Sequence, residues 1–254
     1  IRGKERNKLI SRAYLMLGQA RYYQGKPFQA MDALQQVQGL PFDKHKEESK
    51  FYAALAQVQA GNNFTAMEVL DELYQNEDIK KDLKSRVAKH LAWKYYEEGE
   101  NESALNGLDT AIKFSKNRNE KARLNFIQGQ ILTEMGKYDE ANAKFNKSFK
   151  LKPGFEMEAR SQVAVALNFD PMVHDYTSYR KRLMKLVNTG TYATYKNEFY
   201  YALGQLEEKR DSIGLAQEAY TMALNEKMSD PRFRAETYAA MGQIKFNASD
   251  YVYA

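Results

Sequence analysis

One ten-residue phrase recurs four times along the chain, and it limits the possible folds more than any other feature. The copies read GKPFQAMDAL from Gly25, GNNFTAMEVL from Gly61, GENESALNGL from Gly99 and GKYDEANAKF from Gly136. Their glycines are separated by 36, 38 and 37 residues. A period of this length is typical of helical solenoids, in which each repeat is a small unit that stacks on its neighbours. We therefore expect an array of helix pairs.

Small residues recur at two places in each repeat, where two antiparallel helices must approach closely. The turn glycine permits a positive φ, and a small residue follows it on the second helix: Ala30, Ala66, Ala104 and Ala141. A small residue also faces it on the first helix: Gly18, Ala54, Ala92 and Gly129. Helices approach closely only where side chains are small. Larger residues are expected to fill the space between pairs: Leu17, Leu34, Leu70, Leu91, Leu108 and Phe145.

This pattern resembles the tetratricopeptide repeat, a helix-turn-helix unit with a turn near position 15 and a small residue at position 20. The resemblance implies an all-α fold, a right-handed α-solenoid of about six to seven helix pairs. The repeats are expected at residues 11–44, 47–80, 85–118, 122–155, 156–189 and 197–230, with a partial repeat at 235–254. We expect one superhelical domain over residues 1–254, as a fragment of a longer protein.

Two parts of the chain depart from the repeat pattern. Residues 156–189 show two helical periods around Pro171 but lack the small residues, which indicates a degenerate repeat. The segment 188–196 that follows is expected to be a loop or hinge. The repeat at 197–230 has Asp211 and Ser212 in place of the turn glycine. In the partial repeat, Gly242 and Ala254 take the small positions.

Composition and motifs argue against several classes of site. The chain has no cysteine, which excludes disulfides, thiolate metal ligands and a cysteine nucleophile. His45, His90 and His174 are far apart, so we expect no metal site. No Ser-His-Asp order, HExxH, GxGxxG or Walker loop occurs. The sequence therefore predicts neither an enzyme nor a bound cofactor.

The charge distribution is mild and mixed. The net charge is +5, from 38 Lys and Arg against 33 Asp and Glu, which gives no indication of nucleic-acid binding. The basic cluster at 180–185 is interpreted as a solvated helix face rather than as a phosphate site. No run of about 18 apolar residues occurs, so any membrane association would require a lipid anchor outside this sequence.

In tetratricopeptide proteins the first helices line a groove that holds protein partners, through positions 2, 5, 9, 12 and 13 of each repeat. Carried onto this sequence, the resemblance implies a groove of amides and aromatic rings: Gln19, Tyr22, Phe51, Trp93, Tyr96, Phe126, Gln130, Tyr201, Gln205, Gln243 and Phe246. Amides can bond any peptide backbone, and aromatic rings add contact area at low entropic cost. Trp93 is the candidate anchor. The alternative is that these rings pack inside the core.

Some members of the family bind the C-terminal carboxylate of chaperones through Lys and Asn at positions 5 and 9 of a first repeat. These positions hold Leu15 and Gln19 in the first repeat, and Phe126 and Gln130 in the fourth. The resemblance therefore does not extend to a chaperone clamp.

The C-terminal two fifths resemble a narrower group. PGFEMEARSQVAVALNFDP from Pro153, YKNEFYYALGQLEEKRDSIGLAQEAYTMAL from Tyr195 and RAETYAAMGQIKFNASDYVYA from Arg234 look like tetratricopeptide lipoproteins of the type IX secretion system and gliding motility, the PorW and SprE type. The resemblance implies a lipoprotein on the periplasmic side of the outer membrane, which links a periplasmic ring complex to the outer-membrane translocon. Two alternatives stay open, a cytoplasmic peptide-binding or cochaperone-like scaffold and an accessory domain of an envelope enzyme.

Overall fold

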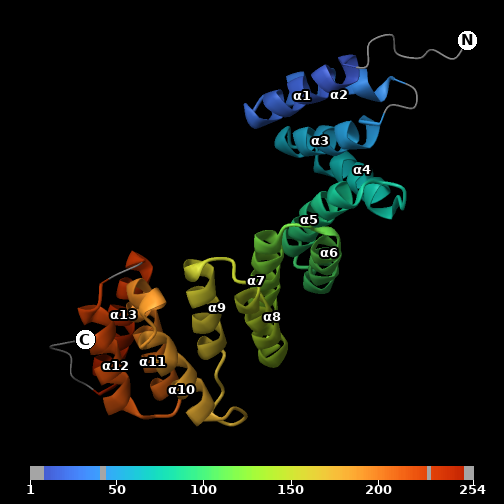
Figure 1. Ribbon diagram of the computed structural model, residues 1–254. Helices are drawn as coiled ribbons and strands as arrows, with labels where there is room; N and C mark the ends of the chain where they lie inside the picture. The colour runs from blue at the N-terminus through green and yellow to red at the C-terminus, as the bar shows by residue number, and fades with distance from the viewer. Residues whose placement is uncertain (1–8, 41–43, 228–229, 249–254) are drawn as a thin grey trace, which may run out of the picture. The chain divides into compact units, whose positions relative to one another are not determined.

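The computed structural model describes residues 9–40, 44–227 and 230–248, and their regular elements are all helical (Figure 1). The all-α solenoid prediction is confirmed for these residues. The chain forms two compact units, residues 1–116 (unit 1) and residues 117–254 (unit 2). The expectation of one continuous domain over 1–254 stays a prediction.

Unit 1 consists of three consecutive helix pairs. Its helices are α1 (Ile10–Tyr23), α2 (Pro27–Gln38), α3 (Lys46–Gln59), α4 (Asn63–Gln75), α5 (Lys81–Glu97) and α6 (Asn101–Phe114). Each first helix packs on its own second helix, and α2 and α4 also pack on the first helix of the next pair. Apolar residues from α1 to α5 form one continuous core.

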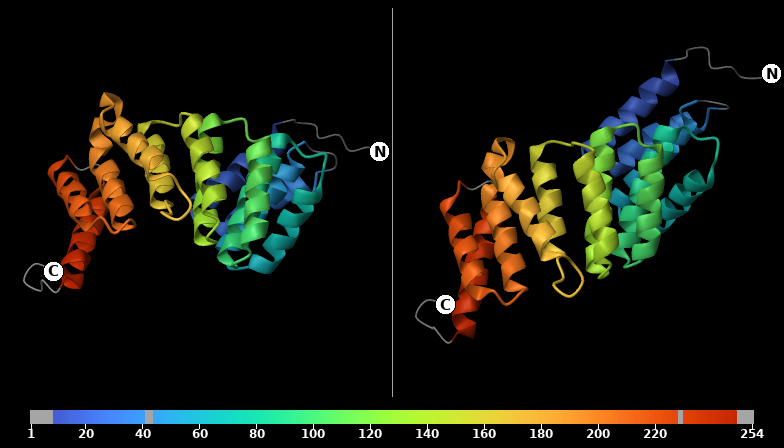
Figure 2. Two further views of the ribbon diagram at one scale, coloured as in Figure 1. Left: turned by 90° about the horizontal axis from the view of Figure 1, so that it is seen from below. Right: turned by 60° about the horizontal axis from the view of Figure 1, so that its bottom comes forward.

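Unit 2 continues the same arrangement with one irregular pair. Its elements are α7 (Arg118–Glu134), α8 (Tyr138–Lys150), α9 (Phe155–Leu167), α10 (Tyr176–Val187), the 3₁₀ helix η1 (Gly190–Tyr195), α11 (Lys196–Glu208), α12 (Ile213–Asn225) and α13 (Pro231–Asn247). In both units the helices lie side by side in a row (Figure 2). The partial repeat extends to Ala254, which lies outside the described residues.

The turns between paired helices have the backbone conformation that the repeat pattern predicts. Gly25, Gly61, Gly99 and Gly136 have φ between +69° and +85°. The fifth such turn uses Asp211, with φ of +59°. The left-handed region is accessible to glycine without steric cost, whereas an L-residue such as Asp211 is strained there.

The predicted close approach between paired helices is also confirmed. At Gly129 on α7, an added Cβ would lie 2.5 Å from the Phe145 ring on α8. Phe145 is itself only 2% exposed. Phe145 and Leu34, which were expected between pairs, lie instead against Gly129 and Gly18 of their own pairs. Leu17 is also placed differently, because it is 45% exposed on a face of α1 that no described helix covers. The prediction for Leu17 was therefore wrong.

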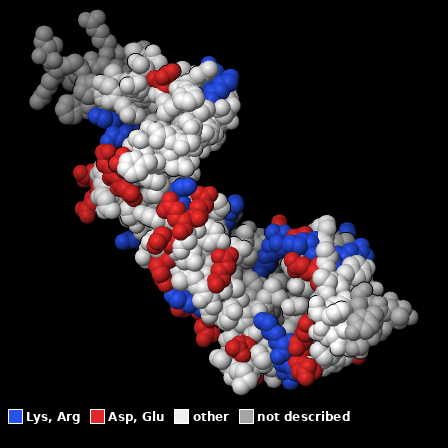
Figure 3. All heavy atoms as spheres, turned by 180° about the vertical axis from the view of Figure 1, so that it is seen from behind, with Lys and Arg blue, Asp and Glu red and all other residues white. Residues whose placement is uncertain are grey.

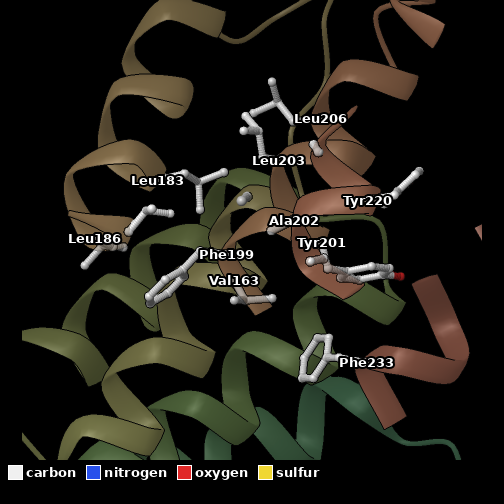
Figure 4. Close-up of a cluster of buried hydrophobic side chains, with 14 of the residues drawn as sticks. Val163, Leu183, Leu186, Phe199, Tyr201, Ala202, Leu203, Leu206, Tyr220 and Phe233 are labelled. Atoms are coloured by element: carbon white, nitrogen blue, oxygen red, sulfur yellow. The ribbon is translucent and has the colours of Figure 1, made fainter. Parts of the chain in front are cut away.

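The core of unit 2 lies around α11, and Figure 4 shows it in close-up. Phe199 from α11 is fully buried in the same cluster as Leu183 and Leu186 from α10. Tyr201 lies beside Tyr220 of α12 and Phe233 of α13, with ring centroids 6.1 and 5.5 Å away. The cluster joins the last three repeats of the unit into one apolar core.

The degenerate repeat is a helix pair, as predicted, but its connection is longer than the other turns. Residues 168–175 link α9 to α10, and Asp170 and His174 hold this turn through a 2.9 Å hydrogen bond from the Asp170 backbone N–H to Nδ1. Asp175 caps α10 by accepting from the Ser178 N–H at 3.0 Å. Because α10 packs mainly on α11, the pair does not need the small residues of a close α9–α10 contact.

The segment 188–196 is not a free loop or hinge, which corrects the sequence-based expectation. Most of it forms η1, and Tyr192 at its centre is 6% exposed. The Tyr192 hydroxyl donates to Glu158 Oε2 at 2.6 Å, and its ring contacts Phe155 and Phe199. The segment is therefore anchored to α9 and α11 by a buried aromatic side chain.

Candidate functional site

The predicted groove residues of unit 1 do not share one environment. Phe51 is only 2% exposed, and its ring packs on His90 and on the Arg86 guanidinium of α5. It belongs to the core, which corrects its assignment to the groove. Arg86 of the next repeat covers the Phe51 ring. Position 5 of a repeat therefore does not by itself determine whether a side chain is exposed.

Tyr22 and Gln19 lie partly exposed on α1. Tyr22 makes edge contacts with Tyr23 and Tyr52, with ring centroids 5.1 and 6.1 Å away. Burial, followed by the neighbouring Tyr23, raises the pKa of Tyr22. Burial also raises the pKa of Tyr52 to about 12. Tyr22 and Tyr52 are therefore uncharged at neutral pH.

Trp93 is 58% exposed, so the alternative that it is a core residue is wrong. Its indole Nε1 donates to Glu97 Oε1 at 2.9 Å, and its ring lies 6.1 Å from that of the half-buried Tyr96. Hydrogen bonds from Lys94, and then from Trp93, lower the pKa of Glu97. An exposed indole held in place by a charged neighbour can provide a contact surface at low entropic cost.

Unit 2 contains a cavity of about 350 Å³ between α7, α9 and α13, which we call the unit 2 cavity. Two of the predicted groove residues, Phe126 and Gln130, line it from α7. The other walls come from α8, α9 and α13: Phe145, Arg160, Val163, Ala164, Leu167, Asn168, Arg232 and Phe233. Thr133 and Glu134 complete its border on α7.

The apolar walls of the cavity include three aromatic rings, those of Phe126, Phe145 and Phe233. Phe126 packs edge-on against Phe145 with centroids 5.2 Å apart. Phe233 is backed by Tyr201, which is 8% exposed and is not among the lining residues. Tyr201 is therefore a core residue beneath the cavity, which corrects its assignment to the groove surface. Burial, and then Glu236, raise its pKa to about 12.

The charges of the cavity are paired within unit 2. Arg160 Nη2 lies 3.1 Å from Glu156 Oε1 and 3.2 Å from Asp230 Oδ2. Arg232 lies 3.5 Å from Glu236 and 4.0 Å from Asp230. Over the face in Figure 3, Lys and Arg are likewise interspersed with Asp and Glu. Because both arginines are paired with carboxylates, the cavity does not present an unpaired positive charge that would bind an anion.

The two amides at the cavity differ in what they can still bind. Asn168 is buried and donates to Thr133 at 3.0 Å and to Asn142 at 3.2 Å. Gln130 is exposed and makes no hydrogen bond within the described residues. Its donor and acceptor are therefore free for a bound molecule.

The remaining predicted residues lie outside the cavity lining. Gln205 donates to the Tyr220 hydroxyl at 2.6 Å, and Gln243 donates to Asn247 at 2.8 Å. Phe246 is 56% exposed on α13. Among the predicted residues of unit 2, the structure brings only Phe126 and Gln130 together in the cavity lining.

Four lining residues were missed although the repeat rule could have found them. Arg160, Ala164, Leu167 and Asn168 take positions 5, 9, 12 and 13 of the degenerate repeat, counted from residue 156. This repeat lacks the small residues that mark the other repeats, so the pattern does not point to these four positions. Phe233 was missed because α13 begins at Pro231, ahead of the expected residue 235.

A second cavity, of about 460 Å³, adjoins the first at Arg160. Phe155, Glu156 and Tyr195 line it together with residues of the turn before α9. Phe155 is 55% exposed. Among the described residues no group of three His, Asp or Glu side chains is arranged to hold a metal ion, and none of their helices is long and apolar enough to cross a membrane.

A scan against protein-family models and a search of curated proteins found no match. Solved structures do match. A tetratricopeptide repeat protein from Parabacteroides merdae is 14% identical, with a TM-score of 0.59, over 94% of this chain and 87% of that one. The pilF protein of Pseudomonas aeruginosa is 17% identical, with a TM-score of 0.53, over 85% of this chain and 90% of its own. MamA is also 17% identical, with a TM-score of 0.50, over 85% of this chain and 94% of its own. The fold is thus a tetratricopeptide α-solenoid.

Proposed function

We propose that the chain is a non-catalytic scaffold that holds a segment of a partner protein in the unit 2 cavity. The observation that carries this proposal is the free amide of Gln130, which lines a cavity of about 350 Å³ together with Phe126 and Phe233. This volume is at the small end of ligand sites, so it suits one or two side chains and the adjoining backbone.

The chemistry of the cavity favours an extended segment with an apolar or aromatic side chain. The partly exposed Phe126 offers apolar area, whereas Phe233, which is 4% exposed, offers little. The Gln130 amide can both donate to and accept from a peptide bond. Because Arg160 and Arg232 already face Asp230, Glu156 and Glu236, a charged segment would have to displace these pairs.

We further propose a cellular setting for this scaffold, as an adaptor of type IX secretion and gliding motility on the periplasmic side of the outer membrane. It would be held there by a lipid anchor outside these 254 residues, and its partners would be components of the ring complex and the translocon. The support is the sequence resemblance of residues 153–254 to lipoproteins of this machinery.

Co-purification from membranes of the native source tests both parts of the proposal. Tagged full-length protein should recover ring or translocon components, and Gln130→Leu should reduce this recovery several-fold without loss of helical circular dichroism. Gln243→Leu is the matched control, because Gln243 also takes position 9 of its repeat but lies outside the cavity. It should leave recovery unchanged.

The outcomes separate the two parts. Recovery of cytosolic chaperones in place of envelope proteins would contradict the secretion setting. The comparison of wild type with Gln130→Leu would then still decide whether the cavity binds the recovered partner. Equal recovery by wild type and Gln130→Leu would contradict the cavity, whatever the partners are.

A further inference from the structure

Unit 2 contains a half-buried arginine, Arg182 of α10, that no carboxylate neutralises. Its Nε donates to Gln162 Oε1 of α9, and its Nη2 donates to Asn146 Oδ1 of α8. It makes no ion pair within the described residues. Burial lowers the pKa of the Arg182 guanidinium, as expected for a cation removed from water without an opposite charge. The interpretation of residues 180–185 as a solvated helix face therefore does not apply to Arg182.

The two amides beside Arg182 each keep an unused donor. A guanidinium has five N–H donors and no acceptor, so the oxygen of each amide must face Arg182 and the NH₂ group must face elsewhere. Gln162 is only 2% exposed, and its Nε2 is buried without an acceptor among the described residues. The Nδ2 of Asn146 likewise makes no hydrogen bond within them.

The guanidinium of Arg182 also retains a fork of donors at its end. The Nε–H and one N–H of Nη2 are used, which leaves both N–H groups of Nη1 and the second one of Nη2. Two parallel N–H groups on Nη1 and Nη2 match the two oxygens of a carboxylate. This part of unit 2 thus offers several donors and one positive charge, and every amide oxygen that contacts Arg182 is already used.

One turn earlier on α10, Tyr179 adds another donor. Its hydroxyl accepts from Asn142 Nδ2 of α8 at 3.1 Å, and the hydroxyl proton has no acceptor within the described residues. Burial, and then Asp139, raise the pKa of Tyr179, so the hydroxyl keeps this proton. The Asp139 carboxylate lies 3.0 Å from His174 Nε2 and does not pair with Arg182.

The surroundings of Arg182 are basic. Beyond Glu140, α8 has no acidic residue, and α10 has none. Lys150 lies four residues after Asn146 on α8, and Lys185 lies three residues after Arg182 on α10, so each continues the same helix face. Both lysines are exposed and make no ion pair within the described residues. We define the Arg182 site as Asn146, Lys150, Gln162, Arg182 and Lys185.

We propose that the Arg182 site binds an acidic side chain of a partner protein through its carboxylate, and that a second acidic residue of the same segment pairs with Lys150 and Lys185. One guanidinium end matches one planar, singly charged carboxylate. In an extended segment, residues two apart lie on one face about 6.6 Å from each other. This spacing is close to the rise of about 4.5 Å between Arg182 and Lys185 along α10. The segment therefore has Asp or Glu at alternate positions.

The Arg182 site is separate from the unit 2 cavity. It is formed by the second helices α8 and α10 with Gln162 of α9, whereas the cavity lies between α7, α9 and α13 and is not lined by any residue of the site. The proposal does not rest on the cavity, and Gln130→Leu should leave binding at Arg182 unchanged.

The test uses the end-blocked peptide GEGEG and its uncharged counterpart GQGQG, titrated into the isotopically labelled 254-residue protein. In NMR spectra, GEGEG should shift the Nε–H resonance of Arg182 and the side-chain amide resonances of Asn146 and Gln162. GQGQG should bind at least tenfold more weakly, because it has nearly the same shape but no carboxylate. Inorganic phosphate, as a competitor, should displace GEGEG only at higher concentration than GEGEG itself requires.

Variants of the protein locate the site. Arg182→Gln should raise the Kd for GEGEG at least tenfold, and Arg182→Lys, which keeps the charge but lacks the fork, at least fivefold. Lys181→Gln is the matched control, because it removes the same charge from an exposed position of the same helix. It should change the Kd less than twofold. Circular dichroism verifies that each variant is folded, and the comparison of the two peptides on the wild type decides the proposal even where Arg182→Gln does not fold.

Three results would overturn the proposal. The first is equal binding of GEGEG and GQGQG, or an Arg182 resonance that GEGEG leaves unmoved at millimolar concentration. The second is phosphate that binds at least as tightly as GEGEG, which would make Arg182 part of a phosphate site. The third is a loss of affinity in Lys181→Gln as large as that in Arg182→Gln, which would show that only the general positive charge of α10 attracts the peptide.

Discussion

A single residue sets the turn before α12 apart from the other turns between paired helices. Asp211 has φ of +59°, where four other turns have glycine. Its side chain is exposed and makes no hydrogen bond or ion pair within the described residues. Nothing therefore offsets the steric strain of a side chain in the left-handed region, although aspartate tolerates this region better than most residues do.

We expect Asp211→Gly to stabilise the protein by about 0.5–1 kcal/mol, because the relief of strain exceeds the extra freedom of glycine in the unfolded chain. The measurement is the urea midpoint at unchanged m-value. Gly136→Asp is the reciprocal control and should destabilise by a similar amount, since Gly136 has φ of +73°. A decrease in stability for Asp211→Gly would show that the aspartate side chain makes a stabilising contact.

Among the individual elements, η1 is held in place by one buried hydroxyl group, although the sequence predicts a loop or hinge for this segment. The Tyr192 hydroxyl donates to Glu158, which is 4% exposed and also lies 3.2 Å from Lys152. Burial, and then this hydrogen bond, raise the pKa of Tyr192, so the hydroxyl keeps its proton. The bond ties η1 to the first turn of α9.

Tyr192→Phe should therefore destabilise unit 2 by about 1–3 kcal/mol, the cost of a buried carboxylate that loses a donor. Tyr195→Phe is the control, because the Tyr195 hydroxyl makes no hydrogen bond within the described residues, and it should stay within about 0.5 kcal/mol of wild type. Chemical denaturation of both variants measures the difference. Equal midpoints for the two variants would mean that ring packing alone holds η1.

The same element-level view explains what the sequence could predict. Gly129 and Gly136 were identified from their spacing because a close helix contact and a positive φ each require a residue without a side chain. Exposure at position 5 was not predictable in this way. Phe51 and Tyr201 are buried there while Phe126 is partly exposed, because Arg86 and Phe233, from later repeats, cover the first two.

The sequence predicts one wall of the unit 2 cavity but not the opposite one. Phe126 and Gln130 follow from the repeat rule, but the opposite wall comes from α13, whose start was misplaced. The pair Asp230-Pro231 carried the signal, since Asp is a favoured cap and Pro a favoured first helical residue. Asp230 does cap α13, accepting from the Arg232 N–H at 2.9 Å.

At the scale of the whole molecule, a solenoid is stabilised by contacts between neighbouring repeats, so stability should fall where a repeat has one neighbour. In unit 2, α11 is packed against α9, α10, α12 and α13, whereas α13 packs on α11 and α12. Tyr238 and Phe246 of α13 are each 56% exposed. The end helix therefore has less cover than an internal helix of the same unit.

We expect amide hydrogens of residues 235–247 to exchange at least tenfold faster than those of residues 122–150 or of α11, because the end helix can open without disturbing the rest of the unit. Hydrogen exchange followed by NMR or mass spectrometry gives the comparison within one sample, and α11 serves as the internal reference. Exchange in α13 as slow as in α11 would mean that an additional element covers Tyr238 and Phe246. In that case Tyr238→Glu should restore fast exchange in α13 while leaving α11 protected, which would locate the covering contact on this exposed face.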